Sequence, residues 1–189
     1  MATVNSYTGR MPTPDRTSLD EIVDAARDIL EHDGLAGLTM QAVAQRVGVR
    51  APSLYKRVQS RDELVRLVAV ATLSDLASRL SDDTDARQIA TEYRRFAHER
   101  PAAFHLVMAP GAHSPRARPE FVDAASVAIL RVATELAGPE HALEAARTLT
   151  AWANGFISME LAGGFNLGGD VDSAWQYGVE RLVAAISAR

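Results

Sequence analysis

Apolar side chains recur every three or four residues through most of this chain, and they do not alternate with polar ones. Residues at that spacing share one face of an α-helix, whereas a half-buried strand needs an apolar residue at every second position. The first stripe of this kind consists of Leu19, Ile22, Val23, Ala26, Ile29 and Leu30. The chain is therefore predicted to be all-α.

Residues that start and stop helices divide the N-terminal part of the chain. Ser18 and Glu21 have the S-x-x-E spacing of a capping box, and Gly34 is placed to end the first helix. Thr39 is a good N-cap for a short second helix, which Gly48 stops. The first 16 residues contain proline, serine and glycine and no apolar run, so we expect a flexible tail at 1–16.

A third and a fourth helix are predicted after Gly48. Pro52 suits the first turn of a helix that continues through Val58. Ser60 and Glu63 repeat the capping pattern and open a long helix toward Leu80. Beyond an acidic loop, further helices are predicted at about 84–99, 101–109, 119–137, 139–162 and 171–188.

Charge is distributed unevenly. Between Thr39 and Arg66 six basic and two acidic residues give a net charge of +4, although the whole chain carries −4. Phosphate groups attract local positive charge, so this window is suited to nucleic acid even though the total charge is not.

Composition excludes several other classes. The chain has no cysteine, which excludes disulfides and cysteine-based metal sites. It has no apolar run long enough to span a membrane and no secretory signal, so a cytoplasmic protein without a membrane partner is expected. No cofactor is expected, because phosphate-loop and catalytic-serine motifs are absent from the sequence.

Two short helices on either side of Gly48 have the pattern of a helix-turn-helix at about residues 39–58. Ala44, Val49 and Leu54 suit the inner faces that hold such helices at an angle. The outer face of the second helix must be polar or small to enter a major groove, and it carries Arg50, Ala51, Ser53, Lys56 and Arg57. The pattern alone also fits an ordinary helical corner with a solvated basic rim.

The wider stretch from Thr17 to Val65 resembles the DNA-binding head of the TetR family of bacterial transcriptional regulators. The resemblance rests on the Ala-Ala of the first helix and on Gly34, Thr39, Val43-Ala44, Gly48-Val49, Leu54-Tyr55 and Arg61-x-x-Leu64. Two residues depart from the family pattern, since Arg57 stands in place of its usual histidine and Val58 in place of its phenylalanine.

This resemblance implies an N-terminal three-helix helix-turn-helix head, at 17–62. A long helix would join it to a C-terminal helical bundle for ligand binding and dimerisation, at 63–189. The protein would then be a repressor that binds a palindromic double-stranded DNA operator as a homodimer and is released by a small-molecule effector.

The resemblance and the chemistry of the side chains together assign DNA-binding roles. Arg50 and Ser53 are candidates for base edges, because arginine pairs bidentately with guanine. Ala51 and Pro52 can touch a thymine methyl group, and Tyr55 resembles a family tyrosine that binds the DNA backbone. The remaining candidates, chiefly for phosphate contact, are Thr39, Lys56, Arg57 and Arg61.

Bulky residues at one-turn spacing predict where the body holds its ligand. The candidates are Phe104, His105, Met108, Trp152, Phe156 and Met159. The alternative is that these side chains only fill the core.

Two apolar stripes near the C-terminus predict a dimer interface of packed helices. They consist of Ala146, Leu149, Ala153, Ile157, Trp175, Val179, Leu182 and Ile186. An intramolecular core face would produce the same pattern.

Two other classes of function remain as alternatives. The five histidines lack metal-ligand spacing, and no glutamate precedes a histidine by three residues, so an enzyme such as a di-iron bundle is not predicted. A helical adaptor whose head has lost its DNA affinity would keep the same sequence pattern. DNA binding that weakens with salt separates it from a regulator.

Overall fold

The computed structural model describes residues 17–80, 85–109 and 119–188, with the side chains of 119–125 left out. In these segments every regular element is a helix, which confirms the all-α prediction. The helices are α1 (Leu19–Gly37), α2 (Met40–Arg46), α3 (Ala51–Leu54), α4 (Arg61–Arg79), α5 (Ala86–Glu99), α6 (Pro101–Met108), α7 (Pro119–Ala137), α8 (Ala142–Leu161) and α9 (Val171–Ser187). The tail predicted at 1–16 lies outside the described residues.

The two residues predicted to open a capping box, Ser18 and Ser60, both begin their helices. The Ser18 hydroxyl accepts from the backbone N–H of Glu21 at 3.1 Å, and the Glu21 carboxylate accepts from the N–H of Ser18 at 2.8 Å. At α4 the box is altered: Ser60 caps the N–H of Glu63, but the Glu63 carboxylate accepts from Gln59. Each arrangement satisfies N–H groups that have no partner inside a helix.

Two predicted helix ends differ from the structure. Gly34 takes a φ of 68°, a left-handed conformation that favours glycine, but a further helical turn follows and α1 ends at Gly37. Helix α3 ends at Leu54 instead of continuing to Val58. The N–H groups of Arg57 and Val58 both donate to the Leu54 carbonyl, at 2.8 and 2.9 Å, so the last turn is tightened.

Helix α8 starts three residues later than predicted. Pro139 and its neighbours form a turn after Gly138, which takes a φ of 76°, and His141 is the N-cap of α8. The turn reverses the chain direction between α7 and α8, which pack against each other in the body.

One buried apolar cluster holds the N-terminal helices together and includes part of α6. Residues of α1, α2 and α3 pack around the first half of α4, from Leu64 to Ala69. Ala103 and Leu106 of α6 are buried in the same cluster. Helix α6 is therefore part of the packing of the head, although it follows α5 in sequence.

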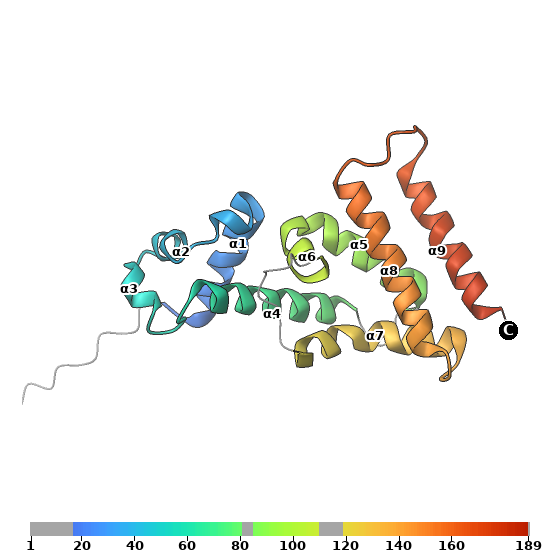
Figure 1. Cartoon of the computed structure of the whole chain (residues 1–189), viewed down its shortest axis with the longest axis horizontal. Helices are drawn as coiled ribbons and strands as arrows, with labels where there is room; N and C mark the ends of the chain where they lie inside the picture. Colours follow the sequence, from blue (N-terminus) through green and yellow to red (C-terminus); the bar gives the residue numbers. More distant parts are fainter. Residues whose placement is uncertain (1–16, 81–84, 110–118, 189) are drawn as a thin grey trace, which may run out of the picture.

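A second cluster forms the body. Leu76 of α4 and its C-cap Leu80 pack there with residues of α5, α7, α8 and α9, and Phe104 of α6 is fully buried among them. Figure 1 shows α4 running from the head at one end of the molecule toward α7 and α8 at the other. Helices α4 and α6 thus contribute to both clusters, and a domain division at 62/63 stays a prediction.

Candidate DNA-binding face and ligand cavity

Helices α2 and α3 meet at a tight turn whose centre is Gly48. Gly48 has a φ of 71°, and the N–H of Val49 donates to the Ala44 carbonyl at 2.9 Å. Ala44 and Leu54 are buried, and Val49 packs against the same cluster. This is the rigid helix pair that a helix-turn-helix needs in order to present its second helix.

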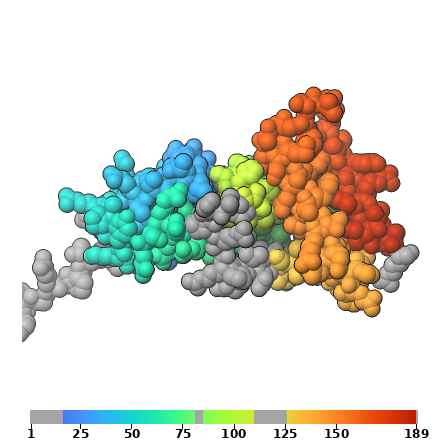
Figure 2. Space-filling model, in the orientation of Figure 1, coloured from blue at the N-terminus to red at the C-terminus, as the bar shows by residue number. Residues whose placement is uncertain are grey.

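The surface of α3 and the following turn gathers most of the residues that the sequence assigned to DNA. Arg50, Pro52, Ser53, Tyr55, Lys56 and Arg57 are exposed, and Ala51 is half-buried. Arg50, Ser53, Lys56 and Arg57 border one surface depression of about 650 Å³. Figure 2 shows this segment, in cyan, at the end of the molecule opposite α9. The segment therefore lies far from the C-terminal helix of the body.

Tyr55 and Val58 have opposite environments. Tyr55 is 51% exposed, whereas Val58 is completely buried. The residue that stands in place of the family's phenylalanine thus fills the core, and the tyrosine before it is available to a partner.

Thr39 lies at the start of α2 and is exposed. Its hydroxyl oxygen accepts from the N–H of Ala42 at 3.1 Å, as predicted for an N-cap. The hydroxyl proton is still able to donate, which is what a phosphate oxygen requires.

Arg61 has a structural role that sequence reasoning did not identify. Its Nε donates to the Leu38 carbonyl at 2.8 Å and its Nη2 donates to the Leu35 carbonyl at 2.5 Å. These carbonyls belong to the segment after the break at Gly34, so Arg61 ties the end of α1 to the start of α4. The contact spans more than 20 residues, so the local spacing of the sequence gives no sign of it.

A cavity of about 150 Å³ lies in the body. Its described walls come from α4, α5, α7, α8 and α9, with Met108 at the end of α6. Leu73 and Leu76 of α4 form one side together with Leu80, its C-cap, so the helix that enters the head also borders the cavity.

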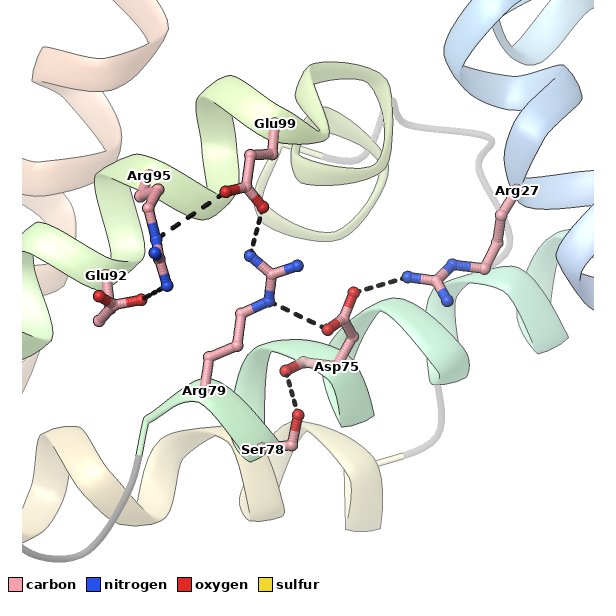
Figure 3. Close-up of polar contacts among 7 residues, drawn as sticks. All are labelled: Arg27, Asp75, Ser78, Arg79, Glu92, Arg95 and Glu99. Atoms are coloured by element: carbon pink, nitrogen blue, oxygen red, sulfur yellow. Dashed lines mark hydrogen bonds and ion pairs between the residues drawn. The ribbon is translucent and has the colours of Figure 1, made fainter.

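A polar network connects the head to the helices around the cavity (Figure 3). Arg27 of α1 donates through Nη2 to Asp75 Oδ2 of α4 at 2.7 Å, and Arg79 Nε donates to the other Asp75 oxygen at 3.0 Å. Arg79 also donates to Glu99 at the end of α5, at 2.6 Å. Burial alone would raise the pKa of Asp75, but hydrogen bonds from Arg79 and Arg27 outweigh it and lower that pKa below its ordinary value.

A second α1 side chain, one turn after Arg27, holds α6. The carboxylate of Glu31 accepts from the N–H of Ala102 at 3.1 Å and from the N–H of Ala103 at 2.9 Å. A carboxylate at this position also meets the positive end of the helix dipole. Helix α1 therefore contacts both α4 and α6 through polar side chains, and each of these helices has residues at the cavity.

Family models match both parts of the chain. Residues 22–68 match the bacterial regulatory proteins of the tetR family, and residues 86–182, more than half of the chain, match the tetracyclin repressor-like C-terminal domain. The chain belongs to the TetR family. Its members are DNA-binding transcriptional regulators, which are not enzymes.

Individual proteins agree with this TetR assignment. The chain is 28% identical over 186 residues to the uncharacterized HTH-type transcriptional regulator Rv0681 of Mycobacterium tuberculosis, a match that covers 93% of this chain and 84% of the relative. A protein of unknown function from Rhodococcus sp. RHA1 has the same fold, with a TM-score of 0.74 at 23% identity over 95% of this chain and 99% of its own. A TetR variant from Acinetobacter baumannii AYE, solved in complex with minocycline, gives a TM-score of 0.65 at 21% identity, covering 89% of this chain and 96% of that one.

The structure brings two of the six predicted ligand residues of this TetR chain to the cavity, Met108 and Trp152. Phe104 is fully buried in the second cluster, and His105 is exposed. Phe156 stacks in an aromatic group with Trp152 and Trp175, while Met159 is 51% exposed. Residues that line the cavity but were not singled out, such as Tyr93, Ile89 and Val183, have ordinary core spacing in the sequence and gave no separate signal.

The eight residues predicted for the dimer interface face the interior of the single TetR chain. Ala146, Ile157, Trp175 and Val179 are buried. Leu149, Ala153 and Leu182 line the cavity, and Ile186 packs against a small cluster of alanines. The sequence pattern could not distinguish a seam between chains from the chain's own core, and the residues of the interface stay a prediction.

Two further properties concern the described residues only. None of their helices has the length and apolarity needed to cross a membrane. Nor do their acidic and histidine side chains form a group of three or more that could hold a metal ion.

Proposed function

We propose that this TetR-family chain is a homodimeric repressor that binds a palindromic DNA operator through α3 and the turn after it. A small molecule bound in the body would release it. The observation that carries the proposal is the exposed basic face formed by Arg50, Lys56 and Arg57 on a rigidly packed helix-turn-helix. The chain as a whole is acidic, yet this face carries positive charge. The face is therefore suited to binding a negatively charged duplex.

Individual roles on this face follow from reach and chemistry. Arg50 and Ser53 lie at the start of α3 and would read base edges, because the N-terminal residues of the second helix enter the major groove. Tyr55, Lys56, Arg57 and the hydroxyl of Thr39 would bind phosphates. Ala51 and Pro52 present apolar carbon that can contact a thymine methyl group.

Arg61 would support this face indirectly. Two of its donor groups already bind the carbonyls of Leu35 and Leu38. A guanidinium has five N–H groups, so a phosphate contact is compatible with the clamp. If Arg61 holds these two carbonyls in place, its replacement should lower the stability of the protein. If Arg61 only contacted phosphate, its replacement would leave the stability unchanged.

The dimer would form through the outer faces of α8 and α9, because the inward faces are already occupied. Gly155 is exposed in the middle of α8, and a Cβ added there would meet nothing within 4 Å. A mid-helix glycine costs roughly 0.5–1 kcal/mol relative to alanine. Packing within the single chain does not require a glycine at this position. A glycine here would allow the α8 helix of a second chain to approach closely. Exposed Met159 and Tyr177 would add apolar area.

Effector release requires that cavity and head share moving parts. Leu73 and Leu76 border the cavity, while Asp75 between them binds Arg27 of the head. Met108 borders the cavity at one end of α6, and Glu31 of the head caps the other end. A ligand that displaced α4 or α6 would change the angle of the head in each protomer. It would thereby change the separation of the two reading helices, about 34 Å in a helix-turn-helix dimer.

The same proposal places the chain in the cytoplasm, where a bacterial operator is accessible, and gives it no catalytic step. The cavity would hold its ligand without transforming it.

Binding to labelled duplex DNA at increasing salt tests the proposal. Each neutralised phosphate contributes about −0.9 to the slope of log affinity against log salt, so a protein with several contacts loses affinity steeply between roughly 50 and 200 mM salt. A chain that bound no duplex at low salt, including the DNA upstream of its own gene, would instead be a helical adaptor.

A further inference from the structure

The walls of the body cavity have an unusually uniform chemistry. Of the eighteen described residues that line it, fifteen have apolar side chains, three carry a hydroxyl group, and none carries a charge. The three hydroxyl residues are Tyr93, Ser126 and Thr150.

The most buried of these hydroxyl groups is already engaged. The Tyr93 hydroxyl donates to Asn154 Oδ1 at 2.5 Å. Burial raises the pKa of Tyr93 above its ordinary value, and the hydrogen bond to Asn154 lowers it only in part. Tyr93 therefore stays neutral at physiological pH and supplies no charge to the cavity.

An ionic ligand group would find no opposite charge among these walls. Taking an ion out of water is costly unless a partner of opposite charge or several hydrogen bonds compensate it. Two charged side chains next in sequence to lining residues are held by partners outside the lining set: Asp75 binds Arg27 and Arg79, and Arg94 binds Glu160 and Asp172. The described part of the walls therefore favours an uncharged ligand.

The volume of the cavity indicates the size of molecule that fits inside it. The cavity measures about 150 Å³. Sites for drug-sized molecules span about 300–1,000 Å³. An engineered apolar cavity of about 150 Å³ in another protein holds a benzene molecule.

Together these observations define a ligand class, and the inference rests on the proposed function because it takes this cavity to be the effector site. We propose that the effector is a compact, uncharged, apolar molecule about the size of one substituted benzene ring. A single hydroxyl on the ring is tolerated, because Thr150 contributes a hydroxyl-bearing side chain to the wall.

Three probes that share one ring test the charge requirement. Benzyl alcohol, benzoate and benzylammonium are each titrated into the full-length protein, and calorimetry measures the heat of binding. A parallel titration follows the fluorescence of Trp152, which lies in the cavity wall. Benzyl alcohol is expected to bind saturably at one site per chain. The two ions are expected to bind at least about tenfold more weakly, because the described residues of the wall offer no counter-charge. Equal affinity for an ion, or no saturable binding of benzyl alcohol, would overturn the inference.

Substitution within the wall tests the location. Ala90→Leu and Ala153→Leu each add three carbon atoms inside the cavity, whereas Thr91→Leu changes the exposed neighbour on α5. The two filled variants are expected to lose benzyl alcohol binding, and the control is expected to retain it. Retained binding in both filled variants would mean that the probe sits elsewhere. If a filled variant does not fold, the charge comparison on the unmodified protein still decides the inference.

DNA binding by the same preparations separates this inference from the proposed function. Ligand selectivity in a protein that binds no duplex would contradict the regulator and leave the ligand class standing. Tight DNA binding without benzyl alcohol binding would contradict the ligand class and leave the regulator standing.

Discussion

Arg27 on α1 and Asp75 on α4 are 48 residues apart and meet through a hydrogen-bonded ion pair of 2.7 Å. Their side chains are only 17% and 24% exposed. Arg79 binds the other oxygen of the same carboxylate and also forms an ion pair with Glu99 of α5. The pair lies where the DNA-binding head meets a helix of the cavity, so it is the natural place to test how the two parts are joined.

Replacing Asp75 by asparagine should destabilise the fold. The substitution removes the negative charge that Arg27 and Arg79 share, and hydrogen bonds to charged groups contribute about 1.5–3 kcal/mol. Asp28→Asn is the matched control, because its pair with Arg46 is about half exposed and such pairs contribute about 0–1 kcal/mol. Urea denaturation of the two variants measures the difference. Equal unfolding free energies would show that the Asp75 pair contributes no more than a surface contact.

The contribution of Asp75 should also depend on pH in a defined direction. Its folded pKa lies below the ordinary value of 3.8, because hydrogen bonds from Arg79 and Arg27 outweigh the opposing effect of burial. Stability from such a group is present above its unfolded pKa and is lost as the pH falls through the folded pKa. The advantage of the unmodified protein over Asp75→Asn should therefore be constant from pH 7 to about 5 and shrink below about pH 4. An advantage that grew on acidification would contradict the shift.

Two glycines in the C-terminal helices should respond oppositely to alanine. A Cβ at Gly178 of α9 would lie 2.2 Å from the ring of Trp152, whereas one at Gly155 of α8 would have open space. Gly178→Ala should destabilise the protein by about 1–3 kcal/mol through overpacking. Gly155→Ala should favour the helix by about 1 kcal/mol in the single chain and weaken the dimer.

Thermal unfolding at two protein concentrations and sedimentation velocity distinguish these effects. If Gly155→Ala left the dimer as tight as before, α8 would not make the close contact that the dimer proposal requires. If Gly155→Ala destabilised the protein under conditions where it is monomeric, that result would contradict the open space that the structure shows around this glycine.

Lys56→Gln and Arg61→Gln should separate contact with DNA from support of the head. Lys56 is exposed, so its replacement should lower the salt slope of DNA binding by about 1 without changing stability. Arg61→Gln should cost about 1–3 kcal/mol of stability, because the carbonyls of Leu35 and Leu38 lose their donor. Urea denaturation and anisotropy titrations measure both quantities in both variants, with Arg87→Gln on α5 as a neutral control. If Arg61→Gln did not change the stability, the bonds to Leu35 and Leu38 would not support the head. Phosphate binding would then be the only role proposed for Arg61.

Local signals in the sequence predicted much of the fold. Capping residues such as Ser18 and Thr39 act on backbone groups within three residues, so their effect can be seen without knowledge of the tertiary structure. The length of α3 was overestimated, because periodicity cannot show that the last turn tightens onto Leu54. The extra turn of α1 beyond Gly34 was missed for a related reason: it is held by Arg61, which lies 23 residues after Leu38.

The site was predicted unevenly. Most of the residues predicted to contact DNA are neighbours in sequence, so one amphipathic turn shows which of them point outward. The cavity instead gathers residues from α4 to α9, and Trp152 or Met108 looks the same in sequence whether it borders a cavity or fills a core. The α8 and α9 stripes had the same ambiguity, because a helix that packs inward and one that packs on a partner bury the same kinds of residue. The Arg27–Asp75 pair had no sequence signal at all, since surface charges are common on helices.

The most direct test of the central claim is selection of duplexes from a random pool by the full-length protein, repeated with Arg50→Ala. The account predicts enrichment of a palindrome whose half-sites are centred about 10 base pairs, or a multiple of that, apart. It also predicts that Arg50→Ala relaxes the preference at one position of each half-site, by about 1–3 kcal/mol. A pool that stays random, or an enriched sequence without two-fold symmetry, would contradict the assignment of this chain as a dimeric operator-binding regulator.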